Sequence, residues 1–143
     1  MEAILALQKL AYQSEAAIYN DFRIPPLTQT LDEITADFAQ QVFLKATLNG
    51  QIIGSVRGYI KGTTRYVGRL IVHPEHQNQG FGTRLLREIE ATFEQAERYE
   101  LFTGSRSARN LHLYEKLGYR EYRREQLSPA VELVYLEKHR TGG

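Results

Sequence analysis

A short turn with two glycines, Gln77-Asn78-Gln79-Gly80-Phe81-Gly82, has the spacing that most clearly favours a chemical role in this sequence. It separates a predicted strand that ends at Val72 from a predicted amphipathic helix that begins at Phe81. The first N–H groups of a helix have no partner within the helix, and the helix dipole makes that end electropositive. Glycine has no Cβ atom, so a ligand can approach the main chain closely. The turn therefore predicts a main-chain site for phosphate or pyrophosphate, to which Arg84 can add a charge-assisted bond.

Other interpretations of the same turn exist. Two glycines before a helix also serve simply to let a loop turn tightly. The dinucleotide-binding pattern G-x-G-x-x-G is excluded because no third glycine follows Gly82 at that spacing, and the Gly-Lys-Ser/Thr of the P-loop is absent. The turn alone leaves the identity of the anion open.

The elements that must position this turn predict one domain of mixed α/β class over residues 1–143. The predicted helices cover residues 3–19, 30–38, 81–98 and 107–117, and the predicted strands cover 42–48, 51–60, 65–72, 99–103, 119–124 and 131–137. Thr30 and Glu33 have the spacing of a capping box, and Asn49-Gly50 is typical of a type I′ hairpin. Pro25-Pro26 predicts extended backbone. Residues 138–143 are expected to form a frayed tail.

Composition limits the classes of partner. The 143 residues include 18 basic and 17 acidic side chains, for a formal charge of +1, which gives no electrostatic footprint for nucleic acid. No apolar run approaches the roughly 18 residues that span a bilayer, and the N-terminus lacks the charged start of a secretory signal. We therefore expect a cytoplasmic protein with no membrane partner. Cysteine is absent, which excludes disulfides, thiolate metal sites and cysteine nucleophiles, and no metal site is expected.

Two blocks of sequence carry a family resemblance. Gln77-x-x-Gly80-x-Gly82, entered from Leu70-Ile71-Val72-His73-Pro74, closely resembles the acyl-CoA signature of the GNAT (Gcn5-related) N-acetyltransferases. Asn110-Leu111-His112-Leu113-Tyr114-Glu115-Lys116-Leu117-Gly118-Tyr119 resembles the later helix-to-strand motif of that family. The resemblance covers residues 3–138 and is strongest over 66–121.

The resemblance implies a fold and a co-substrate. The fold would be an antiparallel meander followed by a βαβα segment, in which the parallel strands 65–72 and 99–103 splay apart and the thioester of acetyl-CoA enters the gap. The main chain of three residues would pair with the pantetheine arm: Leu70, Ile71 and Val72. The pyrophosphate would be held by the turn and the start of its helix: Gln77, Asn78, Gln79, Gly80, Phe81, Gly82, Thr83 and Arg84. Asn110 would bond the pantetheine arm, and Tyr114 would face the sulfur.

The catalytic interpretation is narrower. Tyr114 is the candidate general acid for the leaving thiolate, although its spacing from Leu111 and Leu117 also suits a core position. A main-chain N–H near Ile71 or Val72 would stabilise the oxyanion. The family often has a carboxylate on the strand before the signature, and residues 66–72 contain none. Proton removal from the amine is left to water or to one of three side chains elsewhere: Glu33, His73 or His112.

The acceptor side has weaker signals. Arg69 is a candidate for binding a carboxylate or phosphate of the substrate. Projection of its side chain into solvent is the equal alternative. Phe22 and Leu27, in the segment 19–30, are candidates for an apolar wall or for a cover over the core. The turn 60–65 is the other segment expected at the acceptor.

The chain begins in a predicted helix, whereas the family usually opens with a strand. The first edge strand is therefore expected to be missing, which would leave strand 42–48 with an unpaired edge and favours a homodimer. The leading hypothesis is an N-acetyltransferase acting on a primary amine of a small molecule or a peptide. The alternatives are a non-catalytic acyl-CoA-binding or sensing module and an interaction protein that binds no coenzyme A.

Overall fold

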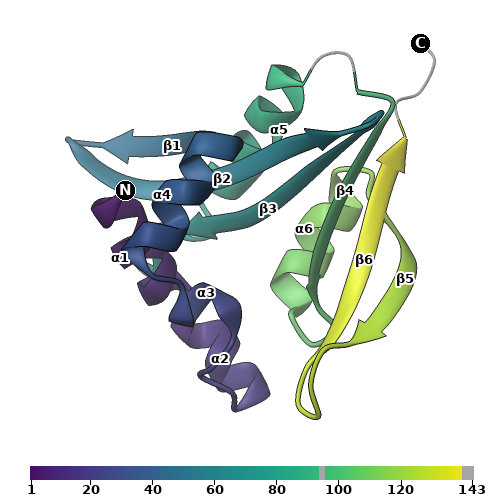
Figure 1. Ribbon diagram of the computed structural model, residues 1–143, viewed down its shortest axis with the longest axis horizontal. Coiled ribbons are helices and arrows are strands. Elements are labelled where there is room, and N and C mark those ends of the chain that lie inside the picture. Colours follow the sequence, from purple (N-terminus) through teal and green to yellow (C-terminus); the bar gives the residue numbers. More distant parts are fainter. Residues whose placement is uncertain (94–95, 140–143) are drawn as a thin grey trace.

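One mixed sheet with helices on both faces forms the protein (Figure 1), seen in a computed structural model that describes residues 1–93 and 96–139. The strand order is β1-β2-β3-β4-β6-β5, and only the β3–β4 pair is parallel. The helices are α1 (Glu2–Ala11), α2 (Gln13–Tyr19), α3 (Pro25–Thr28), α4 (Leu31–Gln40), α5 (Phe81–Thr92) and α6 (Ala108–Lys116), with a 3-10 turn η1 (Pro74–His76). The strands are β1 (Val42–Leu48), β2 (Gln51–Lys61), β3 (Thr64–Val72), β4 (Arg98–Gly104), β5 (Arg120–Gln126) and β6 (Glu132–His139). The predicted α/β class and the meander followed by a βαβα segment are confirmed.

The turns and caps predicted from local sequence signals are present. Asn49 and Gly50 both have positive φ, 53° and 80°, as a type I′ turn between β1 and β2 requires. The Thr30 hydroxyl accepts from the Glu33 N–H at 3.2 Å, and the Thr30 N–H donates to the Glu33 carboxylate at 2.9 Å. This capping box fixes where α4 begins.

Four element boundaries differ from the prediction. The helix expected over 3–19 is interrupted at Tyr12, which ends α1 and precedes α2. Pro25-Pro26 is not extended but opens α3, since proline is well tolerated in the first turn of a helix. The helix α5 ends at Thr92, and residues 94–95 lie outside the described part of the chain. Lys138 and His139 belong to β6 rather than to a frayed tail, whose remaining residues, 140–143, are not described.

The core lies between the sheet and the helices α5 and α6. Leu86 and Ile89 of α5 are fully buried against Val56 and Val134 of the sheet. At the edge of this core, the Lys138 ammonium donates to the Glu90 carboxylate at 2.8 Å. The Tyr119 hydroxyl donates to the same carboxylate at 2.6 Å. These bonds join α5 to β6 and to the segment that follows α6.

The parallel strands β3 and β4 separate soon after they begin. They pair only over Thr64–Tyr66 and Arg98–Glu100, and beyond this the described residues show no pairing between them. A β-bulge in β3 accompanies the separation. Ser55 pairs with Ile71 and Arg57 pairs with Gly68, so Arg69 and Leu70 together lie opposite Val56. The predicted splay of the two strands is present.

The bulge also reverses the faces of β3. Val67 packs in the core beside α5, whereas Ile71 packs with Leu7 and Ala11 of α1, on the opposite face of the sheet. An uninterrupted strand would have placed both side chains on one face. Arg69 has a φ of 49°, a backbone conformation that residues other than glycine adopt rarely. Side chains therefore do not alternate strictly between the two faces along β3.

The N-terminal helices cross the open end of this gap. α1 rests on Ile71 of β3, and α2 reaches the end of β4 through Tyr19. The Tyr19 hydroxyl accepts from the Arg106 N–H at 2.9 Å and lies 2.8 Å from the Ser107 hydroxyl. The sheet edge on the other side is β1, which has β2 as its strand neighbour in the described sheet. None of the described helices has the length and apolar character needed to cross a membrane.

The contact between Tyr19 and Gly104 gives a stability prediction. A Cβ atom at Gly104 would lie 2.0 Å from the Tyr19 hydroxyl oxygen, so Gly104→Ala must displace that ring. We expect a loss of about 1–3 kcal/mol in the free energy of unfolding, measured by urea denaturation. In the background of Tyr19→Ala the same change should cost much less, since the clashing ring is gone. Equal costs in both backgrounds would show that the clash does not limit this position.

Candidate active site

The turn before α5 is open to solvent. Gly80 caps the helix with a φ of 86°, and a Cβ atom built there meets nothing within 4 Å. Asn78, Gln79 and Gly80 are exposed, so the free N–H groups at the start of α5 face solvent. The Gln77 side chain instead donates to the main-chain oxygen of Val72 at 3.3 Å, which ties the turn to the end of β3. This arrangement suits an anion held by main chain, with Thr83 and the exposed Arg84 in the first turn of the helix.

The gap between β3 and β4 continues from this turn. Leu70, Ile71 and Val72 have β2 on one side and, among the described residues, no paired strand on the β4 side. Their main-chain groups on that side are therefore available to an extended ligand. Across the gap, the Asn110 amide donates to the Thr103 hydroxyl at 3.2 Å, which positions the Asn110 side chain beside β4.

Tyr114 lies on the buried side of α6, with 5% of its surface exposed. Its ring meets Tyr119 edge-on at 6.2 Å between centroids. Its hydroxyl makes no hydrogen bond to another of the described residues. Burial, followed by the nearby Tyr12 and Glu15, raises the pKa of Tyr114 well above its usual range. The hydroxyl is therefore protonated at neutral pH and has no bond to break before donating to a ligand.

The three side chains left open as proton acceptors have other roles or positions. The Glu33 carboxylate is used in the capping box of α4, and the hydrogen bonds with Thr30 lower its pKa. The His73 ring accepts from the Glu75 N–H at 3.1 Å and caps η1. His112 is exposed on α6. Within the described residues, no hydrogen bond, ion pair or ring contact joins any of these three side chains to Tyr114.

A group of side chains that sequence reasoning missed surrounds Tyr12, at the break between α1 and α2. We call Tyr12, Glu15, Arg57 and Arg69 the Tyr12 cluster. Burial raises the pKa of Tyr12, the Arg69 and Arg57 guanidiniums lower it, and the Glu15 carboxylate raises it. A second contribution from the Arg69 side chain, which acts as a donor toward the Tyr12 hydroxyl, also lowers this pKa. Arg69 is therefore partly buried near Tyr12 rather than fully exposed, and its role in binding a substrate stays a prediction. No sequence signal distinguishes Tyr12 or Glu15, because both lie in an ordinary helical pattern.

Arg57 is the buried member of this cluster, with 4% of its surface exposed. It donates to the Asp37 carboxylate at 3.0 Å and to the Gln8 amide oxygen, and it lies 4.5 Å from the centre of the Phe43 ring. Gln29 joins the network by donating to Asp37 at 2.7 Å. Burial, with a contribution from Arg69, lowers the pKa of Arg57 to about 10, so it remains charged at neutral pH.

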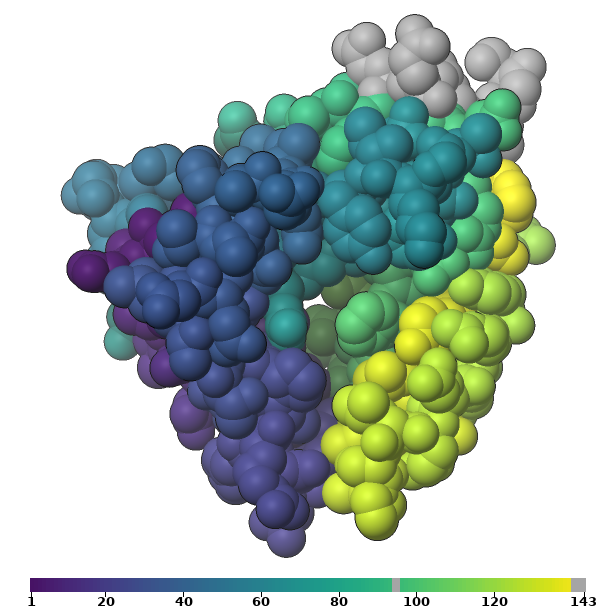
Figure 2. All heavy atoms as spheres, viewed as in Figure 1, coloured from purple at the N-terminus to yellow at the C-terminus, as the bar shows by residue number. Residues whose placement is uncertain are grey.

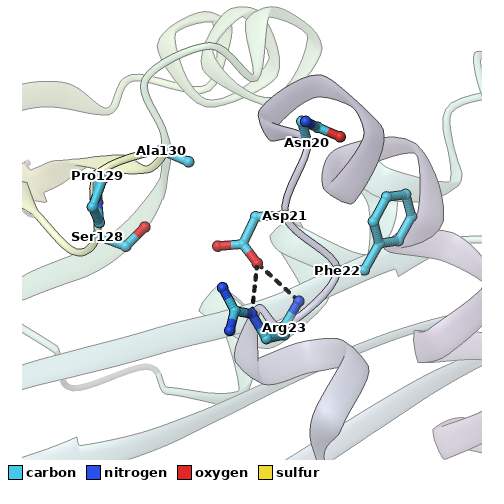
Figure 3. A pocket seen from close by; sticks show the side chains of 7 residues that line it. All are labelled: Asn20, Asp21, Phe22, Arg23, Ser128, Pro129 and Ala130. Atoms are coloured by element: carbon cyan, nitrogen blue, oxygen red, sulfur yellow. Dashed lines mark hydrogen bonds and ion pairs between the residues drawn. The ribbon is translucent and has the colours of Figure 1, made fainter.

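A pocket lies between the α2–α3 loop and the β5–β6 turn (Figure 3). Asn20, Asp21, Phe22 and Arg23 line one side, and Ser128, Pro129 and Ala130 line the other. Phe22, a predicted substrate residue, is among them and is 53% exposed. Leu27 and the turn 60–65, which were also predicted at the acceptor, do not line this pocket. No group of three or more His, Asp or Glu side chains able to hold a metal ion occurs within residues 1–93 and 96–139.

Comparison with known proteins agrees with this geometry. The family model described as the acetyltransferase (GNAT) family matches residues 3–119. The chain therefore belongs to the GNAT acetyltransferase family. A Bacillus subtilis protein named UPF0157 protein YqkA is 30% identical over 118 residues, which are 82% of this chain and 34% of that protein. The chain thus spans about a third of the length of this relative.

Solved structures share the fold. The PaiA N-acetyltransferase of Thermoplasma acidophilum in complex with coenzyme A has a TM-score of 0.74 at 19% identity, over 97% of this chain and 92% of its own. The ribosomal-protein-S18-alanine N-acetyltransferase of Escherichia coli has a TM-score of 0.73 at 17% identity, over 96% and 86%. The protein smu.2055 of Streptococcus mutans has a TM-score of 0.80 at 15% identity, over 96% and 92%.

The Arg57–Asp37 pair gives a second stability prediction. Asp37→Asn removes the anion that faces a buried guanidinium. Breaking a fully buried pair costs about 3–5 kcal/mol. Because Asp37 is 33% exposed, we expect a smaller loss of about 1–3 kcal/mol in the free energy of unfolding. Asp32→Asn, the same change at an exposed position of α4, is the matched control and should cost well under half of that. Similar losses for both variants in urea denaturation would contradict this role of Asp37.

Proposed function

We propose that this protein transfers the acetyl group of acetyl-CoA directly to a primary amine of a small molecule or a peptide. The observation that supports this most is the convergence of three features on one gap: the open start of α5, the unpaired edge of β3, and the protonated Tyr114 hydroxyl. Membership of the GNAT family and the coenzyme A complex of the Thermoplasma neighbour support acetyl-CoA as the co-substrate.

The proposed arrangement follows the direction of the gap. The pyrophosphate of coenzyme A lies on the main chain of residues 77–83, and the pantetheine arm runs along Leu70–Val72 in place of a paired strand. Asn110 contacts this arm from the other side. The thioester then lies between β3 and β4, with the Tyr114 hydroxyl near its sulfur. The amine enters from the face covered by α1 and α2, where Figure 2 shows the surface hollowed between the N-terminal helices and the β5–β6 hairpin.

The transfer forms an N–C bond and breaks the C–S bond of the thioester. The attacking amine must be neutral, and its nitrogen loses a further proton as the amide forms. The leaving thiolate takes a proton from the Tyr114 hydroxyl, which recovers one from solvent or from the amine. Main-chain N–H groups near Ile71 hold the developing oxyanion.

The role of Tyr114 is testable by removal of its hydroxyl. Tyr114→Phe keeps the buried ring, so we expect the melting temperature and the affinity for acetyl-CoA to stay nearly unchanged while kcat falls about 100-fold or more. Tyr135→Phe removes a hydroxyl on β6 that bonds only Glu125 among the described residues and serves as the control. A free-thiol assay of coenzyme A release with a panel of primary amines measures both. Unchanged kcat in Tyr114→Phe would exclude it as the proton donor.

The cofactor site is testable without turnover. A Cβ atom at Gly82 would lie 3.5 Å from the nearest atom, on Leu113, so Gly82→Ala fits the protein itself. The added methyl group would lie between the main chain and a bound pyrophosphate. We expect the dissociation constant for acetyl-CoA, measured by isothermal titration calorimetry, to rise about tenfold or more while the melting temperature does not fall.

This titration, together with the free-thiol assay, separates the competing functions. Binding of acetyl-CoA with no acetylation of any amine would favour a non-catalytic acyl-CoA-binding module, and absence of binding would contradict the proposed function altogether.

A further inference from the structure

The Tyr12 cluster lies where two helices cross the gap between β3 and β4. α1 packs Leu7 and Ala11 on Ile71 of β3, and α2 is held at the end of β4 by Tyr19. Tyr12 is the residue between the two helices, and its hydroxyl acts electrostatically on Tyr114 of α6. The break in the helix is therefore positioned over the gap, on the side from which an acceptor enters.

The side of the cluster that faces β3 has an excess of positive charge. Arg69 and Arg57 lie close enough to repel each other, and one carboxylate, Asp37, contacts Arg57 at 3.0 Å. Arg69 is partly buried and forms no ion pair with any residue in the described ranges 1–93 and 96–139. The similarly shielded Arg98 pairs with both Glu100 and Glu137, each at 2.7 Å. Two neighbouring guanidiniums with one carboxylate leave a site for a further anion.

The side of the cluster that faces β4 and α6 has a negative charge. The Glu15 carboxylate accepts a hydrogen bond from the Ser107 hydroxyl, at the start of α6. Its charge acts on the hydroxyls of both Tyr12 and Tyr114. Glu15 makes no ion pair with a basic side chain among the described residues, Arg69 included. A carboxylate beside the proposed proton donor is suited to bind an ammonium group.

Tyr12 packs against Ile71, two residues along β3 from Arg69. Glu15 follows Tyr12 by one helical turn and reaches Ser107 at the start of α6, so the cationic and the anionic group both lie next to the break between α1 and α2. From this geometry we infer that the acceptor is a small zwitterion, with a primary ammonium held by Glu15 beside Tyr114 and a carboxylate a few bonds away held by Arg69. The inference rests on the proposed function, because it names the acceptor of the same transfer. A free amino acid has this chemistry, whereas a polyamine would place a cation against Arg69.

The experiment compares acceptors that differ in one group. Each primary-amine amino acid is assayed beside its decarboxylated amine, for example phenylalanine beside 2-phenylethylamine, at saturating acetyl-CoA with detection of free coenzyme A. We expect kcat/KM to be about 10- to 100-fold higher for the carboxylate-bearing member of the preferred pair, since a charge-assisted bidentate contact is lost in the other. Phosphoethanolamine is included to distinguish a phosphate from a carboxylate.

Variants assign the preference to one guanidinium. Arg69→Gln should raise KM for the amino acid about 10- to 100-fold, with little change for the decarboxylated amine or in the affinity for acetyl-CoA. Arg69→Lys should restore part of the preference. Arg65→Gln is the matched control: this arginine lies on the same strand, is also partly buried, donates to the Gly62 oxygen at 3.2 Å, and should leave the preference intact.

The outcomes separate the two proposals. Equal rates for both members of every pair, faster turnover of phosphoethanolamine, or equal loss for both members in Arg69→Gln would overturn the inference while leaving the acetyltransferase function standing. If acetyl-CoA binds but no amine reacts, the proposed function fails. The inference is then decided by calorimetric titration of the amino acids into the coenzyme A complex, where binding that Arg69→Gln abolishes supports it and absence of binding overturns it.

Discussion

The bulge at Arg69 and Leu70 is the constraint on which the site depends. β3 pairs with β4 over only three residues, and the extra residue that follows in β3 turns the later side chains to the other face of the sheet. Main-chain groups freed inside a fold need partners, so the edge of β3 from Leu70 to Val72 is a template for an extended ligand. The same backbone change gives Arg69 a φ of 49° and brings it near Tyr12 and Arg57, where we propose that the acceptor binds. One irregularity therefore shapes both the proposed cofactor site and the proposed acceptor site.

Because β3 and β4 separate after three paired residues, the two halves of the sheet are joined by strand pairing only at one end. Polar side-chain contacts join the two halves at the other end. The Tyr19 and Glu15 side chains of α2 meet Ser107 across the open end, and the Tyr19 ring occupies the space where any residue at position 104 larger than glycine would place its Cβ. Behind α1, Arg57 joins β2 to α1 and α4 through Gln8 and Asp37. Buried polar groups are costly unless fully bonded, so such contacts favour one arrangement of the helices over the sheet.

The fold, and the turn geometry of the proposed cofactor site, were largely predictable because their signals are local. The capping box at Thr30, the hairpin at Asn49-Gly50 and the glycine turn at Gly80 are each contained in a few consecutive residues. The main-chain geometry that they require leaves little choice of residue type. The errors are also local in origin. The two prolines were compatible with either extended backbone or a first helical turn, and the break at Tyr12 interrupts a pattern that reads as one continuous helix.

The proposed acceptor site was not predictable, for a physical reason. Its charged groups come from α1, α2, β2 and β3, and what matters is which side chain each meets across the fold. Arg57 is separated from its partner Asp37 by twenty residues, and Glu15 from Ser107 by ninety-two. Periodicity reports which face of an element is buried, but not which polar groups two elements bring together. A coenzyme held by main chain therefore leaves a recognisable trace in one stretch of sequence, whereas an acceptor held by converging side chains leaves its trace only in the folded structure. This difference explains how one fold can keep a single acyl donor and exchange its acceptors: the helices over the gap can be altered without disturbing the bulge beneath them.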